Sequence, residues 1–210
     1  MLSILGLGYA LAKTELDNEF LHKEVGLVLG PDWVKAQLAA INKAFFEAYT
    51  RIYDLTKLED GSAVFGPFRL WAPGKVVKVQ CDASAMFSPA MFAEFVVPFL
   101  AEQCEWLDYS VYHLDGTQCI RHLDMLLGID DLDAIEWTPQ AGVPMGGSPR
   151  WYDLYKRILA AGKSVQAIAV APDEVVPLLD AVGGKGMYIG TRFDSEAAAE
   201  KLTRDVEPYR

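Results

Sequence analysis

Apolar residues recur at every third or fourth position between residues 31 and 56. They are Val34, Leu38, Ile41, Phe45, Tyr49 and Ile52. Such spacing gathers side chains on one face of a helix, so it predicts a long amphipathic helix over residues 31–56. Pro31 suits the first helical turn, and Asp32 suits the positive end of the helix dipole. The apolar opening, residues 1–12, is shorter than the roughly 20 residues of a membrane span. We expect a buried strand or helix there.

From residue 76 onward, short apolar runs alternate with amphipathic stretches. The predicted strands cover 76–81, 109–115, 134–139, 164–170 and 186–192, and the predicted helices cover 88–107, 119–127, 150–162, 172–182 and 194–206. Pro98 lies inside the first of these helices, where a kink or break is expected. Five β/α units in a row indicate a parallel sheet covered by helices, either in a barrel or in a doubly wound sheet. The strand-to-helix turns carry no GxGxxG or GxxxxGK[ST] motif, which disfavours the nucleotide-binding versions.

Composition and charge narrow the class of protein. The chain has 210 residues, 51% of them hydrophobic and 23% charged, which suits one domain over residues 1–210. Its net charge of −10 argues against nucleic acid or an anionic membrane as partner, because both bind through clustered Lys and Arg. The three cysteines lack CxxC spacing, which disfavours a disulfide framework or a Cys-rich zinc motif. A reducing cytoplasm is the simplest setting.

Polar residues gather where the predicted strands end. They are Cys81, Asp82, His113, Asp115, Glu136, Trp137, Thr191 and Arg192. In parallel α/β folds, functional groups lie at these carboxyl ends. His113 and Asp115 share a face because side chains alternate along a strand. With Asp82 and Glu136 nearby and Arg192 opposite, the set could bind a divalent metal or hold a carboxylate for proton transfer. The alternative is structural: His113 and Asp115 bond each other and the Gly116 turn.

The remaining histidines and Cys119 give weaker signals. His122 follows the apolar stripe of its predicted helix, so capping or packing is expected rather than ligation. Cys119 is expected to be a small buried residue. His22 lies in a polar stretch with no visible partner. No Ser-His-Asp arrangement with a nucleophile elbow can be recognised.

Three stretches resemble the uroporphyrinogen decarboxylase-like superfamily. They are QCDASAMFSPAMFAEFVVPFL, YHLDGTQCIRHLDMLLGIDDLDAIEWTP and AAGKSVQAIAV. The superfamily comprises the haem-pathway decarboxylase and the corrinoid-dependent methyltransferases, all on (β/α)8 barrels. The resemblance covers residues 76 to about 206, while residues 1–75 form a divergent part that matches in outline. It implies an incomplete TIM-barrel fold of five to seven β/α units, in an N-terminally shortened member.

The resemblance carries some site residues over and leaves others out. The methyltransferases hold zinc with a His-x-Cys pair at the end of this strand and a second Cys on a later strand. Here His113 matches the histidine, Asp115 replaces the first cysteine, and the later position falls at Thr191-Arg192. Zinc would therefore have His113 and Asp115 as its ligands. A hypothesis in place of the metal is that Asp115 and Arg192 pair across the pocket.

The decarboxylases match at other positions. Their Asp-Gly pair corresponds to Asp115-Gly116, and an acidic residue before Trp corresponds to Glu136-Trp137. Their late strand ends in a glycine-flanked histidine, where this chain has GTRF. A lyase acting on a tetrapyrrole carboxylate would also need several arginines, and the strand ends offer only Arg192.

The resemblance therefore favours a methyltransferase-type enzyme acting on a small methylated compound or a corrinoid-linked methyl group. Asp82, His113 and Asp115 would be catalytic, and Glu136, Trp137 and Arg192 would bind the small-molecule substrate. A corrinoid protein would be the partner. The alternatives are a decarboxylase-like lyase and a non-catalytic binding protein or degenerate homologue. Eight strands close a barrel and five are recognisable, which leaves two unpaired edges. We expect the chain either to form a homo-oligomer through these edges or to lack an independent active site.

Overall fold

A computed structural model describes residues 30–210, which divide into two compact units. The first unit contains the described residues up to Ser110 together with Arg121–Leu132, and the second contains Val111–Ile120 and Asp133–Arg210. One five-stranded sheet has the order β3 (Val76–Val79), β4 (Tyr109–Asp115), β5 (Ala134–Thr138), β6 (Ser164–Val170) and β7 (Met187–Thr191). The expected opening segment and His22 lie outside the described residues.

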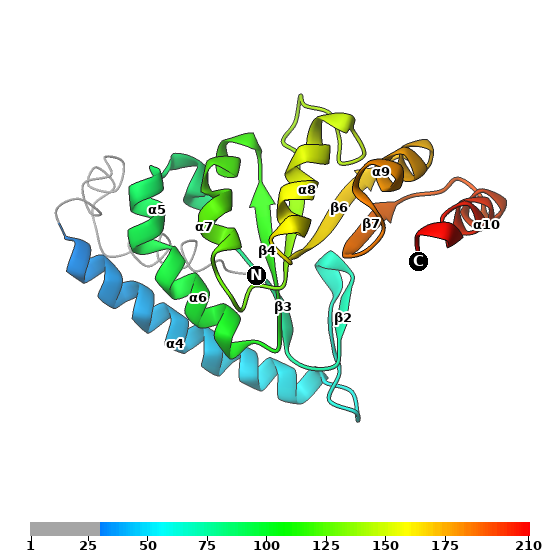
Figure 1. Ribbon diagram of the computed structural model, residues 1–210. Coiled ribbons are helices and arrows are strands. Elements are labelled where there is room, and N and C mark those ends of the chain that lie inside the picture. The colour runs from blue at the N-terminus through cyan, green and yellow to red at the C-terminus, as the bar shows by residue number, and fades with distance from the viewer. Residues whose placement is uncertain (1–29) are drawn as a thin grey trace. The chain divides into compact units, whose positions relative to one another are not determined.

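Helices make up most of the described part of the first unit. They are α4 (Pro31–Thr56), α5 (Pro89–Phe95), α6 (Val97–Trp106) and α7 (Leu123–Leu127). The helix predicted over 31–56 is confirmed at both ends, and Leu38 and Ile41 of α4 pack with Phe95 in an apolar cluster. In Figure 1, α5 and α6 follow one another along the length of α4. The break expected near Pro98 is confirmed, because α5 ends at Phe95 and α6 begins at Val97.

A buried polar contact fixes how α4 lies on α6. Asn42 is completely buried, and its Nδ2 donates to the Phe99 carbonyl oxygen at 3.0 Å and to Glu102 Oε2 at 2.6 Å. Gln103 Nε2 donates in turn to Asn42 Oδ1 at 2.8 Å. A buried amide without partners would cost the free energy of its desolvation. The satisfied set therefore specifies one register between the two helices.

A short hairpin was missing from the predicted strands. β1 (Ala63–Phe65) pairs antiparallel with β2 (Leu70–Ala72), and the 3-10 turn Gly66–Phe68 joins them. Three-residue strands are too short to show a period of two in the sequence. Ala63 and Ala72 face inward with Val76, which ties the hairpin to the start of β3.

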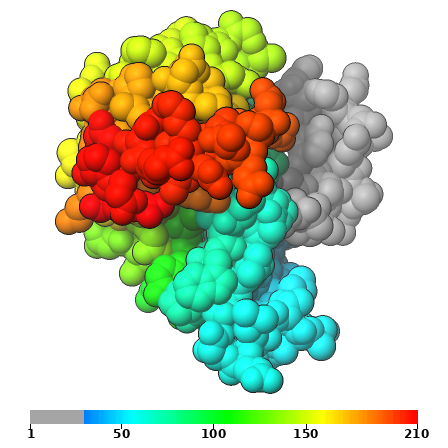
Figure 2. All heavy atoms as spheres, turned by 90° about the vertical axis from the view of Figure 1, so that its right-hand side faces the viewer, coloured from blue at the N-terminus to red at the C-terminus, as the bar shows by residue number. Residues whose placement is uncertain are grey.

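In the second unit, β4 to β7 pair in parallel and carry helices on one face. The helices are α8 (Tyr152–Ala160), α9 (Val175–Val182) and α10 (Glu196–Asp205). α8 packs on β6 and on α9, and Figure 1 shows both helices beside the strands. In Figure 2 the last residues of the chain (red) lie at the surface beside the gold and orange segments of α9 and β7.

The two faces of this sheet differ in chemistry. The apolar face consists of two in-register rows, the first with Tyr112, Ile135, Val165 and Met187, and the second with Leu114, Trp137, Ala167 and Ile189. The alternate positions form the polar row, which we define as His113, Glu136, Gln166 and Tyr188. Buried polar groups are costly unless they are paired or used. The polar row is therefore the candidate functional face of the sheet.

All five predicted β/α units are present, with strand and helix limits shifted by a few residues. The last strand covers Met187–Thr191 instead of 186–192, and the helix expected over 119–127 begins as a 3-10 helix, Thr117–His122, before α7. The other short 3-10 turns are Asp82–Met86, Pro149–Trp151, Pro172–Glu174 and Glu207–Tyr209. The result is a mixed α/β fold with a five-stranded sheet flanked by helices. Over residues 30–210, no helix is long and apolar enough to cross a membrane.

The loop between β5 and α8 is packed closely against β6 at Gly146. A Cβ atom at this position would lie 2.2 Å from the Ile168 carbonyl oxygen, which is backbone and cannot rotate away. The Gly146 carbonyl oxygen also accepts a hydrogen bond of 2.7 Å from the buried Tyr155 hydroxyl. Only glycine therefore allows this loop to reach the strand.

We expect Gly146→Ala to lower the free energy of unfolding by about 1–3 kcal/mol, the usual cost of overpacking. Gly66→Ala is the matched control, because nothing lies within 4 Å of a Cβ built there and its φ is not positive. Chemical denaturation of the two variants measures the difference. Equal stability of both variants would show that the loop does not need this close approach.

Candidate acid–base site

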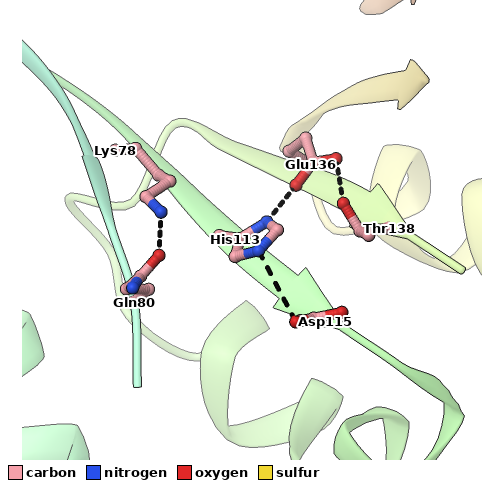
Figure 3. A network of polar contacts seen from close by, with 6 residues as sticks. All are labelled: Lys78, Gln80, His113, Asp115, Glu136 and Thr138. Atoms are coloured by element: carbon pink, nitrogen blue, oxygen red, sulfur yellow. Dashed lines mark hydrogen bonds and ion pairs between the residues drawn. The ribbon is translucent and has the colours of Figure 1, made fainter. Parts of the chain in front are cut away.

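The site begins with two neighbouring residues on adjacent parallel strands. His113 of β4 and Glu136 of β5 are in register, so their side chains leave the same face of the sheet side by side. Glu136 is 1% exposed, and the His113 side chain is 16% exposed. His113 Nδ1 forms a short hydrogen bond with Glu136 Oε2 (Figure 3). A buried carboxylate is costly unless its oxygens are paired, and this contact pairs one of them.

Thr138 pairs the other oxygen of the same carboxylate. Its hydroxyl donates to Glu136 Oε1 at 2.6 Å, and side-chain alternation puts Thr138 on the Glu136 face of β5. Glu136 is thus held from both sides, which fixes the plane of its carboxylate. Since an ionised carboxylate only accepts hydrogen bonds, Nδ1 of His113 carries the proton that it shares with Glu136.

The opposite ring nitrogen of His113 faces Asp115. His113 Nε2 lies 3.9 Å from Asp115 Oδ2, too far for a hydrogen bond, and 58% of the Asp115 side chain is exposed. Figure 3 shows the imidazole between Glu136 on one side and Asp115 on the other. Because the proton is on Nδ1, Nε2 carries the lone pair in the neutral ring. The arrangement therefore puts the acceptor nitrogen of the ring on the side of an exposed carboxylate.

The turn after β4 holds this strand end in place. Gly116 has φ +80, and its N–H donates to the Thr138 carbonyl oxygen at 2.9 Å. Gln140 Oε1 accepts from the Thr117 N–H at 2.8 Å, and Gln140 Nε2 donates to Thr117 Oγ1 at 2.7 Å. These hydrogen bonds tie the ends of β4 and β5 to each other, just past the His113–Glu136 pair. Glycine is required at 116, because L side chains rarely adopt this backbone conformation.

Tyr155 of α8 is influenced by the same carboxylate. Burial, and next the negative charge of Glu136, raise the pKa of its phenol, which donates a hydrogen bond to the Gly146 carbonyl oxygen. Tyr155 therefore stays neutral at physiological pH. It is a packing residue with a satisfied hydroxyl, and it offers no second acid.

The other predicted site residues lie in different settings. Asp82 is exposed at the start of the 3-10 turn Asp82–Met86, which belongs to the first compact unit. Arg192 is exposed directly after β7. In the described part of the chain it forms no ion pair with Asp115, so the hypothesis of that pairing receives no support. His113, Asp115 and Glu136 are the predicted residues that lie together.

Trp137 needs a correction, because the sequence interpretation made it a substrate-binding residue. It is fully buried, and its ring packs against Trp151 with centroids 4.9 Å apart. It follows Glu136 along the strand, so alternation points it to the apolar face. Trp137 therefore contributes packing under the helices and does not share a face with the acid–base pair.

The structural roles expected for Cys119 and His122 are confirmed by their burial. Cys119 is 3% exposed and His122 is 1% exposed. The His122 ring stacks on Phe92 with centroids 4.2 Å apart, and its Nε2 donates to the Ser84 carbonyl oxygen at 3.0 Å. Arg121 Nη2 donates to the Ala85 carbonyl oxygen at 2.6 Å. The side chains of Arg121 and His122 thus hold the turn that follows β3.

Sequence reasoning missed Thr138 and Gln140. Both follow the strand-end residues that it selected, and both act by fixing them. A polar residue two positions after Glu136 was visible in the sequence as the same-face neighbour. The bond from Gln140 back to Thr117 depends on the loop conformation, which no periodicity encodes.

The predicted zinc site has fewer donors than a catalytic zinc needs. His113 and Asp115 supply two donors, whereas a catalytic zinc uses three protein ligands. Within residues 30–210, no group of three or more His, Cys, Asp or Glu side chains is placed to hold a metal ion. These residues alone do not fit a zinc centre. Elemental analysis of the purified wild type beside His113→Ala tests the expectation directly.

Comparisons with protein-family models, with curated proteins and with solved structures found no match to the chain. The resemblance to the uroporphyrinogen decarboxylase-like superfamily therefore stays a prediction.

Burial lowers the pKa of His122, and the charge of Arg121 adds to this effect, while the bond to Ser84 opposes it. The unfolded chain then binds a proton more readily than the folded one, so stability falls as pH drops below about 6.5. We expect this loss to be smaller in His122→Gln. Denaturation of both proteins between pH 7.5 and roughly 5 measures it. Parallel stability profiles would contradict the assignment of His122 as a buried neutral imidazole.

Proposed function

We propose that the chain is a methyltransferase-type enzyme of the uroporphyrinogen decarboxylase-like superfamily. It would act on a small methylated compound or a corrinoid-linked methyl group. Its sheet would be part of a barrel of the (β/α)8 type. The observation that carries the proposal is the imidazole of His113, which the buried Glu136 carboxylate orients at the carboxyl end of β4. Functional groups of parallel α/β folds lie at such ends.

The pair supplies the acid–base part of methyl transfer. A thiol or hydroxyl that accepts a methyl group must lose its proton, and Nε2 of His113 can accept that proton. The bond from the acceptor sulfur or oxygen to the methyl carbon would form as the bond between that carbon and the methyl donor breaks, and the electron pair of the broken bond would leave with the donor. The imidazolium formed in this way is stabilised by Glu136 on Nδ1 and by the charge of Asp115 at 3.9 Å from Nε2. General-base catalysis of this kind contributes about 10²–10⁴-fold. No step of the proposal uses a metal.

The decarboxylase alternative is less well supported. A tetrapyrrole carboxylate would need several arginines near the reacting group. His113 instead has two carboxylates beside it, at Glu136 and Asp115. These negative charges would repel such a substrate.

A non-catalytic binding protein is the second candidate. The missing thiolates and the lack of a metal-binding group within the described residues favour it. It requires that the His113–Glu136 pair bind a ligand without transferring a proton. The corrinoid protein partner and the homo-oligomer stay predictions.

The test is demethylation of methylcobalamin with a panel of thiol acceptors, followed by visible absorbance. We expect turnover by the wild type and a loss of about 10²-fold or more in His113→Ala, the usual contribution of a general base. Glu136→Gln keeps the shape of the side chain and removes the charge, and its amide oxygen can still accept from His113 Nδ1–H, while its NH2 group can only donate to the Thr138 hydroxyl. It should therefore slow turnover and shift the pH profile. Arg204→Ala, on the exposed face of α10, is the control and should behave as the wild type.

Two results would contradict the proposal. Turnover by His113→Ala equal to that of the wild type would show that the imidazole is not the base. A wild type that binds a methylated ligand but transfers no methyl group to any acceptor would favour the non-catalytic binding protein instead. Thermal melts of each variant separate loss of activity from loss of fold.

A further inference from the structure

A hollow of about 250 Å³ lies on the apolar face of β7, on the opposite side of this strand from the polar row. Residues of α9, β7, α10 and the C-terminal turn Glu207–Tyr209 line it. Met187, Ile189 and Thr191 alternate with Tyr188, so they leave the strand on the side away from the polar row. The hollow is therefore separate from the acid–base site, and what it binds does not depend on the proposed function.

The helix α10 covers the hollow without filling it. Leu202 and Val206 lie one helical turn apart and both line the hollow, yet no residue of α10 is buried. Native interiors leave few voids larger than a water molecule. A helix that packed down onto β7 with these two side chains would close the space.

The chain is fastened on both sides of α10, which keeps the hollow open. After the helix, the Tyr209 hydroxyl donates a hydrogen bond to Asp180 Oδ1 of α9. Gly184 lets the Tyr209 backbone come close, because a Cβ atom there would lie 2.1 Å from the Tyr209 carbonyl oxygen. Before the helix, residues 192–195 connect it directly to β7. Held at both ends, α10 bridges the hollow instead of collapsing into it.

The lining of the hollow selects an uncharged ligand. Among the described residues that line it, Arg210 is the only charged one, and its Nη1 lies 3.1 Å from Glu207 Oε2. Thr203 also lines the hollow, and its hydroxyl donates to the Ala199 carbonyl oxygen at 2.9 Å. A charged ligand would lose hydration here, and the one charge in the lining is already paired.

Size and side-chain type narrow the ligand further. An engineered cavity of about 150 Å³ with an apolar lining binds benzene. By this scale, a hollow of about 250 Å³ holds roughly ten non-hydrogen atoms. Met187 and Phe193 are part of the lining. A thioether sulfur and an aromatic ring both make favourable contacts with a second ring.

We propose that this hollow is a binding site for a small uncharged aromatic molecule of roughly ten non-hydrogen atoms. The ring of the ligand lies between β7 and α10, against Ile189 on one side and Leu202 on the other. Burial of its apolar surface supplies the affinity. The helix α10 is the cover of the site, and the bond between Tyr209 and Asp180 holds that cover in place.

The test is an NMR titration of the whole chain with carbon-13 in the methyl groups of Met and Ile. Benzamide, benzoate and benzamidine have the same shape and the same number of non-hydrogen atoms, but they are neutral, negative and positive. We expect benzamide to shift the methyl signals of Met187 and Ile189 in a saturable way. It should bind about tenfold or more tightly than either charged compound, because an unpaired charge is costly to bury.

Variants that fill the hollow test its position. Val206→Phe adds a ring inside the hollow and should remove the saturable shifts. Leu202→Phe repeats the test at a second lining position, so a folding defect in one variant does not decide the result. Arg204→Phe is the control, because it adds the same ring at a position of α10 where 70% of the side chain is exposed. It should bind benzamide as the wild type does.

Three results would overturn the proposal: unchanged Met187 and Ile189 signals with benzamide, equal affinity for a charged compound, or wild-type binding by both filling variants. Signals that move with protein concentration alone would also reject it. They would show that a second copy of the chain occupies the hollow in place of a small molecule.

Discussion

The carboxylate of Glu136 is the constraint around which the second unit is organised. It is almost fully buried in the middle of a parallel sheet, where an unpaired charge costs several kcal/mol. His113 and Thr138 each take one of its oxygens, and their positions follow from strand register and alternation. Removing one partner from such a buried set typically costs about 3–5 kcal/mol. The position and orientation of His113 are therefore tied to the stability of the sheet.

This constraint connects the fold to its chemistry through the two faces of the sheet. The apolar face is covered by α8 and α9, and it needs only packing, as the contact between Trp137 and Trp151 illustrates. The polar row has no packing explanation, since burying Glu136 and Gln166 brings no hydrophobic gain. Oriented polar groups of this kind are expected at a binding or catalytic site, where strict preorganisation is useful.

Much of the fold could be predicted because its signals are local. The helix Pro31–Thr56 follows from apolar spacing, and the β/α alternation from residue 76 follows from short apolar runs between amphipathic ones. The hairpin with Val64 and Trp71 could not be predicted, because three-residue strands carry too little pattern. The division into two units was not visible either, since Val111–Ile120 belongs to one unit and the following Arg121–Leu132 to the other.

The site was predicted in part, for a similar reason. His113, Asp115 and Glu136 could be selected because strand ends and alternation are visible in the sequence, and the structure brings these three together. Trp137 was named as a substrate-binding residue because it stands at a strand end, and its alternation with Glu136, which points it to the apolar face, was not considered. Gln140 and its bond to Thr117 depend on a loop conformation that no short motif encodes.

The central claim is that the Glu136 carboxylate holds the His113 imidazole by its Nδ1–H. Nitrogen-15 NMR of the histidine side chains, in the wild type and in Glu136→Gln, tests it most directly. The account predicts that neutral His113 carries its proton on Nδ1, with a strongly deshielded proton signal that moves upfield when the carboxylate becomes an amide. A His113 ring protonated on Nε2, or an Nδ1 proton signal unchanged in Glu136→Gln, would contradict it.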